Sequence, residues 1–126
     1  MSSELERPEI EAPRGAAPEY LDITDLVVGD GDEAVRGSTV EVHYVGVAHS
    51  TGAEFDASWN RGETFSFTLG EGNVIKGWEM GVKGMRAGGR RKLVIPPHLG
   101  YGNRGAGSAI RPGESLIFVV DLIAVK

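Results

Sequence analysis

Apolar and polar residues alternate along several stretches of the chain, which is the pattern of strands that bury only one face. In residues 40–44 and 65–69 every second side chain is apolar, and residues 91–95 follow the same two-residue period. Residues 115–125 are apolar on both faces, which indicates a central strand, and residues 21–28 can form a further strand. On one side of the central strand we expect Leu116, Phe118, Val120 and Leu122.

The segment from Val74 to Met85 follows the period of an α-helix instead. Asn73 can cap its start, and Gly84 lies close to its end. A single helix cannot cover both faces of five strands, so the sequence predicts an α+β fold in which a curved five-stranded antiparallel sheet wraps around one short helix. The apolar face of the predicted helix carries Ile75, Trp78, Val82 and Met85.

The composition is that of an ordinary globular protein. The chain has 126 residues, of which 40% are hydrophobic and 25% charged, a size and composition that predict one domain. Its net charge of -5 argues against a dominant attraction to nucleic acid or to an anionic membrane. The absence of cysteine excludes disulfides, thiolate metal sites and cysteine nucleophiles. The chain starts without an apolar signal core and has no apolar run of membrane-spanning length, so we expect a cytoplasmic protein.

The first residues differ in composition from the rest. Residues 1–18 are rich in proline and acidic side chains and nearly lack large hydrophobic ones, which predicts a flexible acidic N-terminal tail. Residues 19–126 are predicted to form the folded domain. Through Glu19 the chain carries five acidic residues and two arginines, a charge of -3, so the remainder is nearly neutral.

Three local motifs suggest cofactor sites, and each fails on its surroundings. Residues 100–105 fit the Gly-x-Gly-x-x-Gly dinucleotide pattern, but residues 106–113 contain proline and glycine and cannot form the helix that a phosphate site needs. Residues 72–77 have the Walker spacing, yet Trp78 stands where the phosphate-binding lysine is required. We therefore expect no cofactor and no metal, since metal-ligand spacing is also missing among His43, His49 and His98.

A different set of residues indicates a pocket for a small apolar group. Val74, Ile75 and Trp78 lie together where the predicted helix begins and can form an apolar floor. Each aromatic residue could equally belong to the core. A ligand pocket is favoured because Asp56 follows Phe55 directly and because a loop flanked by glycine carries a tyrosine. The aromatic residues around this carboxylate come from separate segments: Tyr44, Phe55, Phe65, Tyr101 and Phe118.

Residues 20–126 resemble the FKBP-type peptidyl-prolyl isomerases in the order and spacing of several motifs. Any one of them is weak alone, but together in register they are specific. The motifs are Val42-His-Tyr-Val-Gly46, Gly52-x-x-Phe-Asp-x-Ser58, Phe65-x-Phe-x-Leu-Gly70, Val74-Ile-Lys-Gly-Trp-Glu79, Gly81-x-x-x-Met85, Ile95-Pro96, Tyr101-Gly102 and Leu116-Ile-Phe-x-Val120.

The resemblance implies a fold, an activity and a set of site residues. The fold is a five-stranded antiparallel sheet around a short helix, and the activity is rotation about X-Pro peptide bonds during protein folding. It further implies that this chain is a minimal single-domain protein of the bacterial type and a monomer. Its expected ligands are proline-containing peptides, folding proteins and macrolides such as rapamycin. A non-catalytic module that binds peptides in the same pocket is the alternative. By motif position the catalytic residues are Asp56, Tyr101, Phe55 and Trp78, and the substrate-binding residues are Tyr44, Phe65, Val74, Ile75, Ile110 and Phe118.

Two features of the chain depart from the family pattern. Family members often have Ile-Pro-Pro in the last loop before the final strand, whereas this chain has Ile110-Arg111-Pro112. Ala106 and Ala109 are small where bulkier side chains are common. The rim of the predicted pocket therefore differs more from the family pattern than its floor does.

Overall fold

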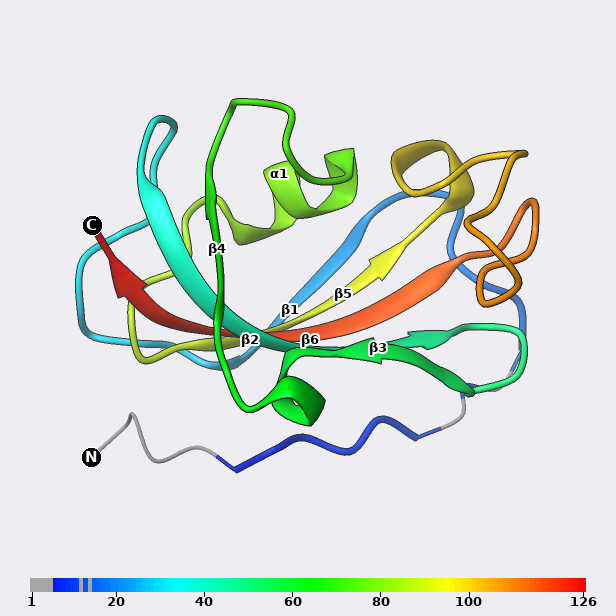
Figure 1. Cartoon of the computed structure of the whole chain (residues 1–126), viewed down its shortest axis with the longest axis horizontal. Coiled ribbons are helices and arrows are strands. Elements are labelled where there is room, and N and C mark those ends of the chain that lie inside the picture. Colours follow the sequence, from blue (N-terminus) through cyan, green and yellow to red (C-terminus); the bar gives the residue numbers. More distant parts are fainter. Residues whose placement is uncertain (1–5, 12, 14) are drawn as a thin grey trace.

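The computed structural model describes residues 6–11, 13 and 15–126, which form one antiparallel sheet and one α-helix (Figure 1). The strands run in the order β1-β5-β6-β2-β3, and β4 also pairs with β2. The predicted α+β class, a curved antiparallel sheet with one short helix, is therefore confirmed. The elements are β1 (Asp22–Val27), β2 (Thr39–Ala48), β3 (Glu54–Ala57), the 3-10 turn η2 (Ser58–Arg61), β4 (Phe65–Thr68), α1 (Lys76–Val82), β5 (Arg90–Ile95), the 3-10 turn η3 (Pro97–Leu99) and β6 (Leu116–Val125).

Two short strands share one edge of β2, which explains why the sheet has six strands and not five. β4 pairs with the first part of β2, from Thr39 to Val42, and β3 pairs with the second part, from Val45 to Val47. The turn η2 lies between them. The sequence did not predict β3, because its four residues mix exposed and buried positions without a clear period.

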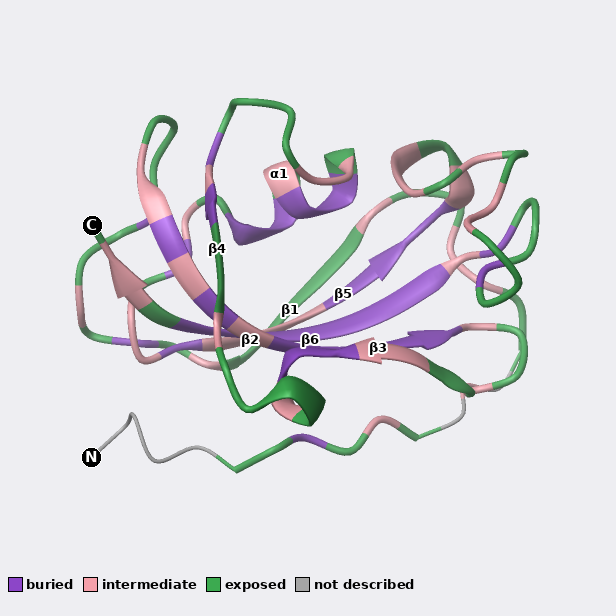
Figure 2. Ribbon diagram, viewed as in Figure 1, coloured by how far each residue is buried: buried purple, intermediate pink, exposed green. Residues whose placement is uncertain are grey.

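The strand β6 is the centre of the sheet, as its apolar sequence predicts. It pairs with β2 on one side and with β5 on the other, and its first seven residues are buried (Figure 2). The predicted faces are confirmed. Leu116, Phe118, Val120 and Leu122 belong to the core under α1, while Ile117 belongs to a second apolar cluster.

The helix α1 is shorter than its sequence pattern predicts. It covers Lys76–Val82, and its N-cap residue is Ile75, whose backbone is extended. The prediction that Asn73 caps the helix is wrong, because the N-cap makes no side-chain hydrogen bond. Ile75 and Met85 still pack in the same core, although neither is helical. The spacing of apolar residues therefore continues past the ends of the helix, because it reflects which residues are buried and not which residues are helical.

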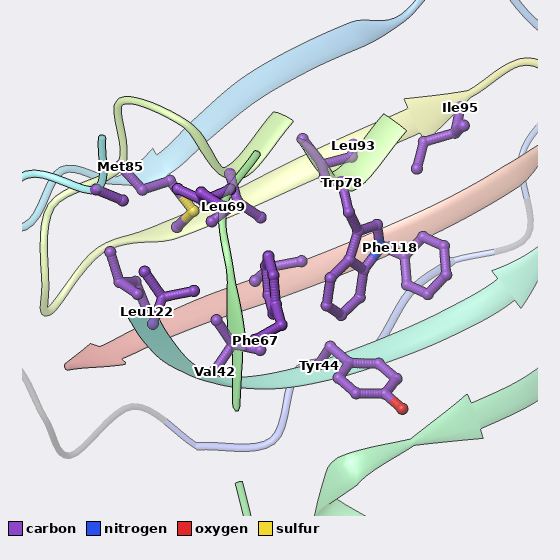
Figure 3. Packing of buried hydrophobic residues seen from close by; sticks show 14 of the residues in the cluster. Val42, Tyr44, Phe67, Leu69, Trp78, Met85, Leu93, Ile95, Phe118 and Leu122 are labelled. Carbon is purple, nitrogen blue, oxygen red and sulfur yellow. The ribbon is translucent and has the colours of Figure 1, made fainter. Parts of the chain in front are cut away.

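Two glycines let α1 lie unusually close to β5. A Cβ atom on Gly77 would lie 2.6 Å from Ile95, and one on Gly81 would lie 2.7 Å from Leu93. The two glycines are four residues apart, so both face the sheet. This close approach brings Trp78 down onto the concave face of the sheet (Figure 3).

A second apolar cluster covers the opposite face of the sheet. It consists of Val45, Val47, Ala57, Val94 and Ile117, with Trp59 and Ile10 packed against it. The described part of the N-terminal segment runs along this face, away from α1 (Figure 1).

Several contacts hold the described N-terminal residues against the domain. Pro8 is buried, and Arg7 forms an ion pair of 2.6 Å with Glu54. Arg90 donates a hydrogen bond to the backbone carbonyl of Glu6. The composition of residues 1–18 did not predict these contacts. The flexibility predicted for this segment stays a prediction, and part of it, residues 1–5, 12 and 14, lies outside the described residues.

Candidate active site

A cavity of about 350 Å³ opens between α1, the concave face of the sheet and the loop of residues 101–114, here called the flap. Every residue predicted for the site lines this main cavity, together with Asn73, Ala106 and Ala109. The structure thus brings the predicted residues together, while their separate roles stay predictions. Asn73, expected as a helix cap, lies at the rim of the cavity instead.

The floor of the main cavity is the indole of Trp78, which is only 4% exposed. The rings of Tyr44 and Phe118 meet it edge-on, with centroids 5.0 and 5.2 Å away and interplanar angles of 81° and 86°. Phe65 and Phe67 complete the ring cluster at 6.0 and 5.6 Å. Edge-to-face pairs are favourable for aromatic quadrupoles, so these contacts lock the floor in place.

The one polar atom of the floor is the indole nitrogen of Trp78. It is buried and finds no hydrogen-bond acceptor among the described residues. In Figure 3 the nitrogen lies toward the ring of Phe118, which stands perpendicular to the indole. An N–H group directed at an aromatic face is a weak but favourable contact. The floor therefore has an almost wholly apolar character.

One wall of the main cavity depends on a glycine in β2. Phe55 and Phe118 meet edge-on with centroids 5.5 Å apart, and both rings lie against Gly46. A Cβ atom at this position would come within 2.6 Å of Phe118 and 2.8 Å of Phe55. The glycine is required here because any side chain would displace at least one of the two rings that line the cavity.

The polar edge of the main cavity is a three-residue network. The hydroxyl of Tyr44 donates to Oδ2 of Asp56 at 2.5 Å, and Nη1 of Arg61 donates to Oδ1 at 2.8 Å. Nη2 of Arg61 also donates to the hydroxyl of Tyr44 at 2.9 Å, which closes the network. Asp56 thus accepts one side-chain hydrogen bond at each oxygen.

Arg61 is a site residue that the sequence analysis missed. It follows Asp56 by five residues, and the 3-10 turn η2 between them brings its guanidinium back to the carboxylate. The signal in the sequence was an arginine in the same short stretch as Asp56. No periodic pattern indicates such a pair, because η2 is a single irregular turn.

The electrostatics of the network keep Asp56 ionised. Partial burial raises the pKa of Asp56, but the hydrogen bonds from Tyr44 and Arg61 outweigh it and bring the pKa below its ordinary value. For Tyr44, burial and the hydrogen bond to Asp56 raise the pKa. The hydrogen bond to Asp56 also raises the pKa of Arg61. At neutral pH the network consists of a carboxylate, a neutral phenol and a guanidinium.

Tyr101 stands on the opposite side of the main cavity, in the flap. Its side chain is partly exposed and makes no hydrogen bond within the described part of the chain. Burial, and then the charge of Asp56, raise the pKa of its phenol. Tyr101 is therefore a neutral hydrogen-bond donor with no acceptor inside the domain, suited to a carbonyl group of a ligand.

Two loops that bear cavity residues are fixed by hydrogen bonds. The flap closes on itself, because the backbone N–H of Ala106 donates to the carbonyl of Ile110 at 2.8 Å and the reverse bond is 3.1 Å. The loop before α1 is held by Glu79, whose carboxylate accepts from the N–H groups of Gly70 at 2.6 Å and Gly72 at 2.9 Å. Glu79 is a second residue whose role the sequence analysis missed.

The three histidines considered as metal ligands do not line the main cavity. His43 stacks on Trp59 with ring centroids 4.2 Å apart, and its Nδ1 lies 2.8 Å from the hydroxyl of Ser58. Over the described ranges, no group of three or more histidine, cysteine or acidic residues could hold a metal ion. Within the same ranges, no helix is long and apolar enough to cross a membrane.

Comparisons with known proteins agree with one another. A family model described as FKBP-type peptidyl-prolyl cis-trans isomerase matches residues 31–123. A protein of Streptomyces anulatus named FK506-binding protein is 61% identical over 122 residues, which cover 96% of this chain and 98% of that protein. A Corynebacterium glutamicum protein named probable FK506-binding protein is 52% identical over 120 residues, covering 95% and 99%. The crystal structure of AtFKBP13 matches with a TM-score of 0.78 at 43% identity, covering 87% of this chain and 96% of that one.

Proposed function

Since this chain belongs to the FKBP-type peptidyl-prolyl cis-trans isomerase family, we propose that it accelerates rotation about X-Pro bonds of folding proteins by desolvating and positioning them over Trp78. Membership in the family makes it a peptidyl-prolyl isomerase acting on proline-containing chains. The mechanism and the range of ligands are the subject of the proposal.

The reaction needs no bond to be broken. Resonance stiffens the peptide C–N bond and sets a rotation barrier of about 18–20 kcal/mol, so uncatalysed exchange takes roughly tens to hundreds of seconds. In the twisted transition state that resonance is lost, and the amide dipole becomes smaller. An apolar, water-poor cavity therefore disfavours the planar ground state more than the twisted state.

The required acceleration is modest. A turnover of roughly 1 to 10³ per second against an uncatalysed rate of about 10⁻² per second corresponds to about 3–7 kcal/mol. Desolvation and positioning together can supply this amount without a nucleophile. No covalent intermediate is therefore needed in the proposal.

The observation that supports this mechanism best is the chemical character of the main cavity. Its floor is apolar, and its titratable groups do not change their protonation state near neutral pH. In the proposal, the proline ring of the substrate lies over Trp78, and Tyr101 donates a hydrogen bond to a substrate carbonyl. Asp56 and Arg61 hold Tyr44 and thereby the edge of the cavity.

A rate measurement tests the proposal. We expect the protein to accelerate cis-trans exchange in Ala-Xaa-Pro-Phe peptides, and Trp78→Leu to lose at least about tenfold in kcat/KM, equivalent to about 1.4 kcal/mol of transition-state stabilisation. Trp59→Phe is the matched control, because Trp59 packs on the opposite face of the sheet. A wild-type protein that binds these peptides without accelerating exchange would instead be a non-catalytic binding module.

We further propose that macrolides such as rapamycin occupy the same cavity. The support is the apolar floor, the donor Tyr101 and the names of the two relatives above. Rapamycin should inhibit competitively and change the tryptophan emission. If Trp78 reports, Trp59→Phe keeps the emission change and Trp78→Phe loses it, whereas the reverse result would contradict the placement.

A further inference from the structure

A second depression, here called the side groove, adjoins the main cavity. It has a volume of about 340 Å³ and lies between the turn that joins β2 to β3 and the end of the flap. Phe55 and Ala109 line both spaces, so the two are adjacent at these side chains. A peptide whose proline occupies the main cavity would extend its neighbouring residues into the side groove.

We propose that the side groove binds the substrate chain beside the X-Pro unit and that Arg111 selects an acidic side chain there. The proposal rests on the proposed function, since it names a class of substrate for the same site. Arg111 is also the position where the chain departs from the Ile-Pro-Pro pattern of its family. The preference would therefore be a property of this chain.

Both carboxylates that line the side groove already have hydrogen-bond donors at each oxygen. Glu54 accepts from Arg7 at 2.6 Å through Oε1 and from Asn60 at 2.9 Å through Oε2. Glu114, which is buried, accepts from the hydroxyl of Ser50 at 2.6 Å through Oε1 and from its backbone N–H at 3.1 Å through Oε2. Each of the four carboxylate oxygens therefore already accepts one hydrogen bond, and the charge of Glu54 is balanced by Arg7.

The remaining charged group in the lining of the side groove is the guanidinium of Arg111. Its side chain is exposed and makes no hydrogen bond or ion pair within the described part of the chain. Its backbone is held on both sides, since Ile110 is buried in the core and Pro112 favours an extended conformation before it. The guanidinium is thus a fork of free donors on a side chain whose backbone is held, and a carboxylate matches that fork geometrically.

The effect should be modest, because the pair would form at an exposed site. Exposed ion pairs correspond to roughly two- to fivefold in affinity. We expect this factor in KM and little change in kcat, since Arg111 does not line the main cavity.

A panel of proline peptides tests the proposal. Each peptide carries Glu, Gln or Lys at one position, from three residues before the proline to three after it. For the wild-type protein we expect Glu to be preferred over Gln, and Gln over Lys, at one or two adjacent positions, with a difference that shrinks as salt increases. Arg111→Gln should remove this order, and Arg111→Glu should reverse it.

Arg104→Glu is the matched control. It makes the same charge change in the same flap, on an exposed residue that lines neither space. It should keep the wild-type preference. Equal loss of the preference in Arg104→Glu and Arg111→Glu would overturn the proposal, because the field of the whole flap would then select the substrate. A wild-type protein without any preference would overturn it as well.

A second measurement distinguishes a failure of the proposed isomerase function from a failure of the inference about Arg111. If the wild-type protein accelerates none of the peptides, fluorescence anisotropy of labelled Glu and Gln peptides still measures whether Arg111 selects an acidic residue. Tighter binding of the Glu peptide that disappears in Arg111→Gln would support the inference, and equal binding of both peptides would overturn it.

Discussion

Replacing Asp56 by asparagine is the sharpest test of how the polar edge of the cavity works. The change removes the negative charge but keeps the size of the side chain and an oxygen that can accept from Tyr44. If the carboxylate acts by holding Tyr44 and the cavity edge, activity should fall only partly. If it transfers protons, activity should disappear. The structure favours the first outcome, because hydrogen bonds from Tyr44 and Arg61 keep Asp56 ionised.

The magnitude follows from the exposure of the pair. The side chains of Asp56 and Arg61 are 42% and 47% exposed, so solvent screens much of their attraction. We expect Asp56→Asn to lower the free energy of unfolding by about 1 kcal/mol and kcat/KM by about three- to tenfold. Asp56→Ala should reduce kcat/KM by roughly ten- to a hundredfold, because the partly buried hydroxyl of Tyr44 loses its acceptor.

The pH dependence separates the two roles. The pKa of Asp56 is lowered in the folded protein, so its contribution to stability is complete above the unfolded value of about 3.9 and is lost as the pH falls through the folded pKa. The raised pKa values of Tyr44 and Tyr101 keep both phenols neutral up to alkaline pH. Histidines are absent from the lining of the cavity. Turnover should therefore be flat from about pH 5.5 to 8.

Peptide isomerisation and urea unfolding, each measured across pH, provide the assay. Asp56→Asn should weaken the loss of stability below about pH 4 relative to the wild-type protein and leave the flat activity profile unchanged. A double-mutant cycle with Arg61→Gln should show coupling, since the two side chains share one hydrogen bond. A bell-shaped activity profile that vanishes in Asp56→Asn would refute this reasoning and make the carboxylate a general acid or base.

Other parts of the structure lead to further expectations. Gly46→Ala should displace the ring of Phe55 and lower the free energy of unfolding by about 1–3 kcal/mol. It should also lower kcat/KM more than about tenfold, and wild-type turnover would contradict the placement of that ring. Arg90→Met leaves Asp121, which is 1% exposed, as a buried charge without its cation, so denaturant unfolding should show a loss of about 3–5 kcal/mol. Ile10→Ala should lower the unfolding free energy by about 1 kcal/mol with unchanged turnover, and an unchanged midpoint would mean that this residue does not pack on the sheet in solution.

Much of the architecture could be predicted from the sequence, because burial leaves a periodic trace. The two-residue alternation around Val42 and Phe67 and the apolar run through Phe118 identified strands and the faces that they bury. Motif spacing then placed Trp78 and Asp56 in one site, and the structure brings them together. The strand inferences depend on neighbours within a few residues, where the periods of strand and helix are regular. The joint placement of Trp78 and Asp56 instead came from the order of motifs along the chain.

Other features were decided only by the tertiary structure. Arg61 joins the site because η2 turns the chain back, and Asn73 faces the cavity because the helix begins later than its apolar pattern. Arg111 lines a groove whose two carboxylates accept hydrogen bonds from residues distant in sequence, Arg7 to Glu54 and Ser50 to Glu114. The pattern of apolar residues along the sequence shows which positions are buried and with what period they recur. It does not record which remote charge or ring meets that side chain, because this depends on strand order, sheet curvature and the close approach of α1 to β5.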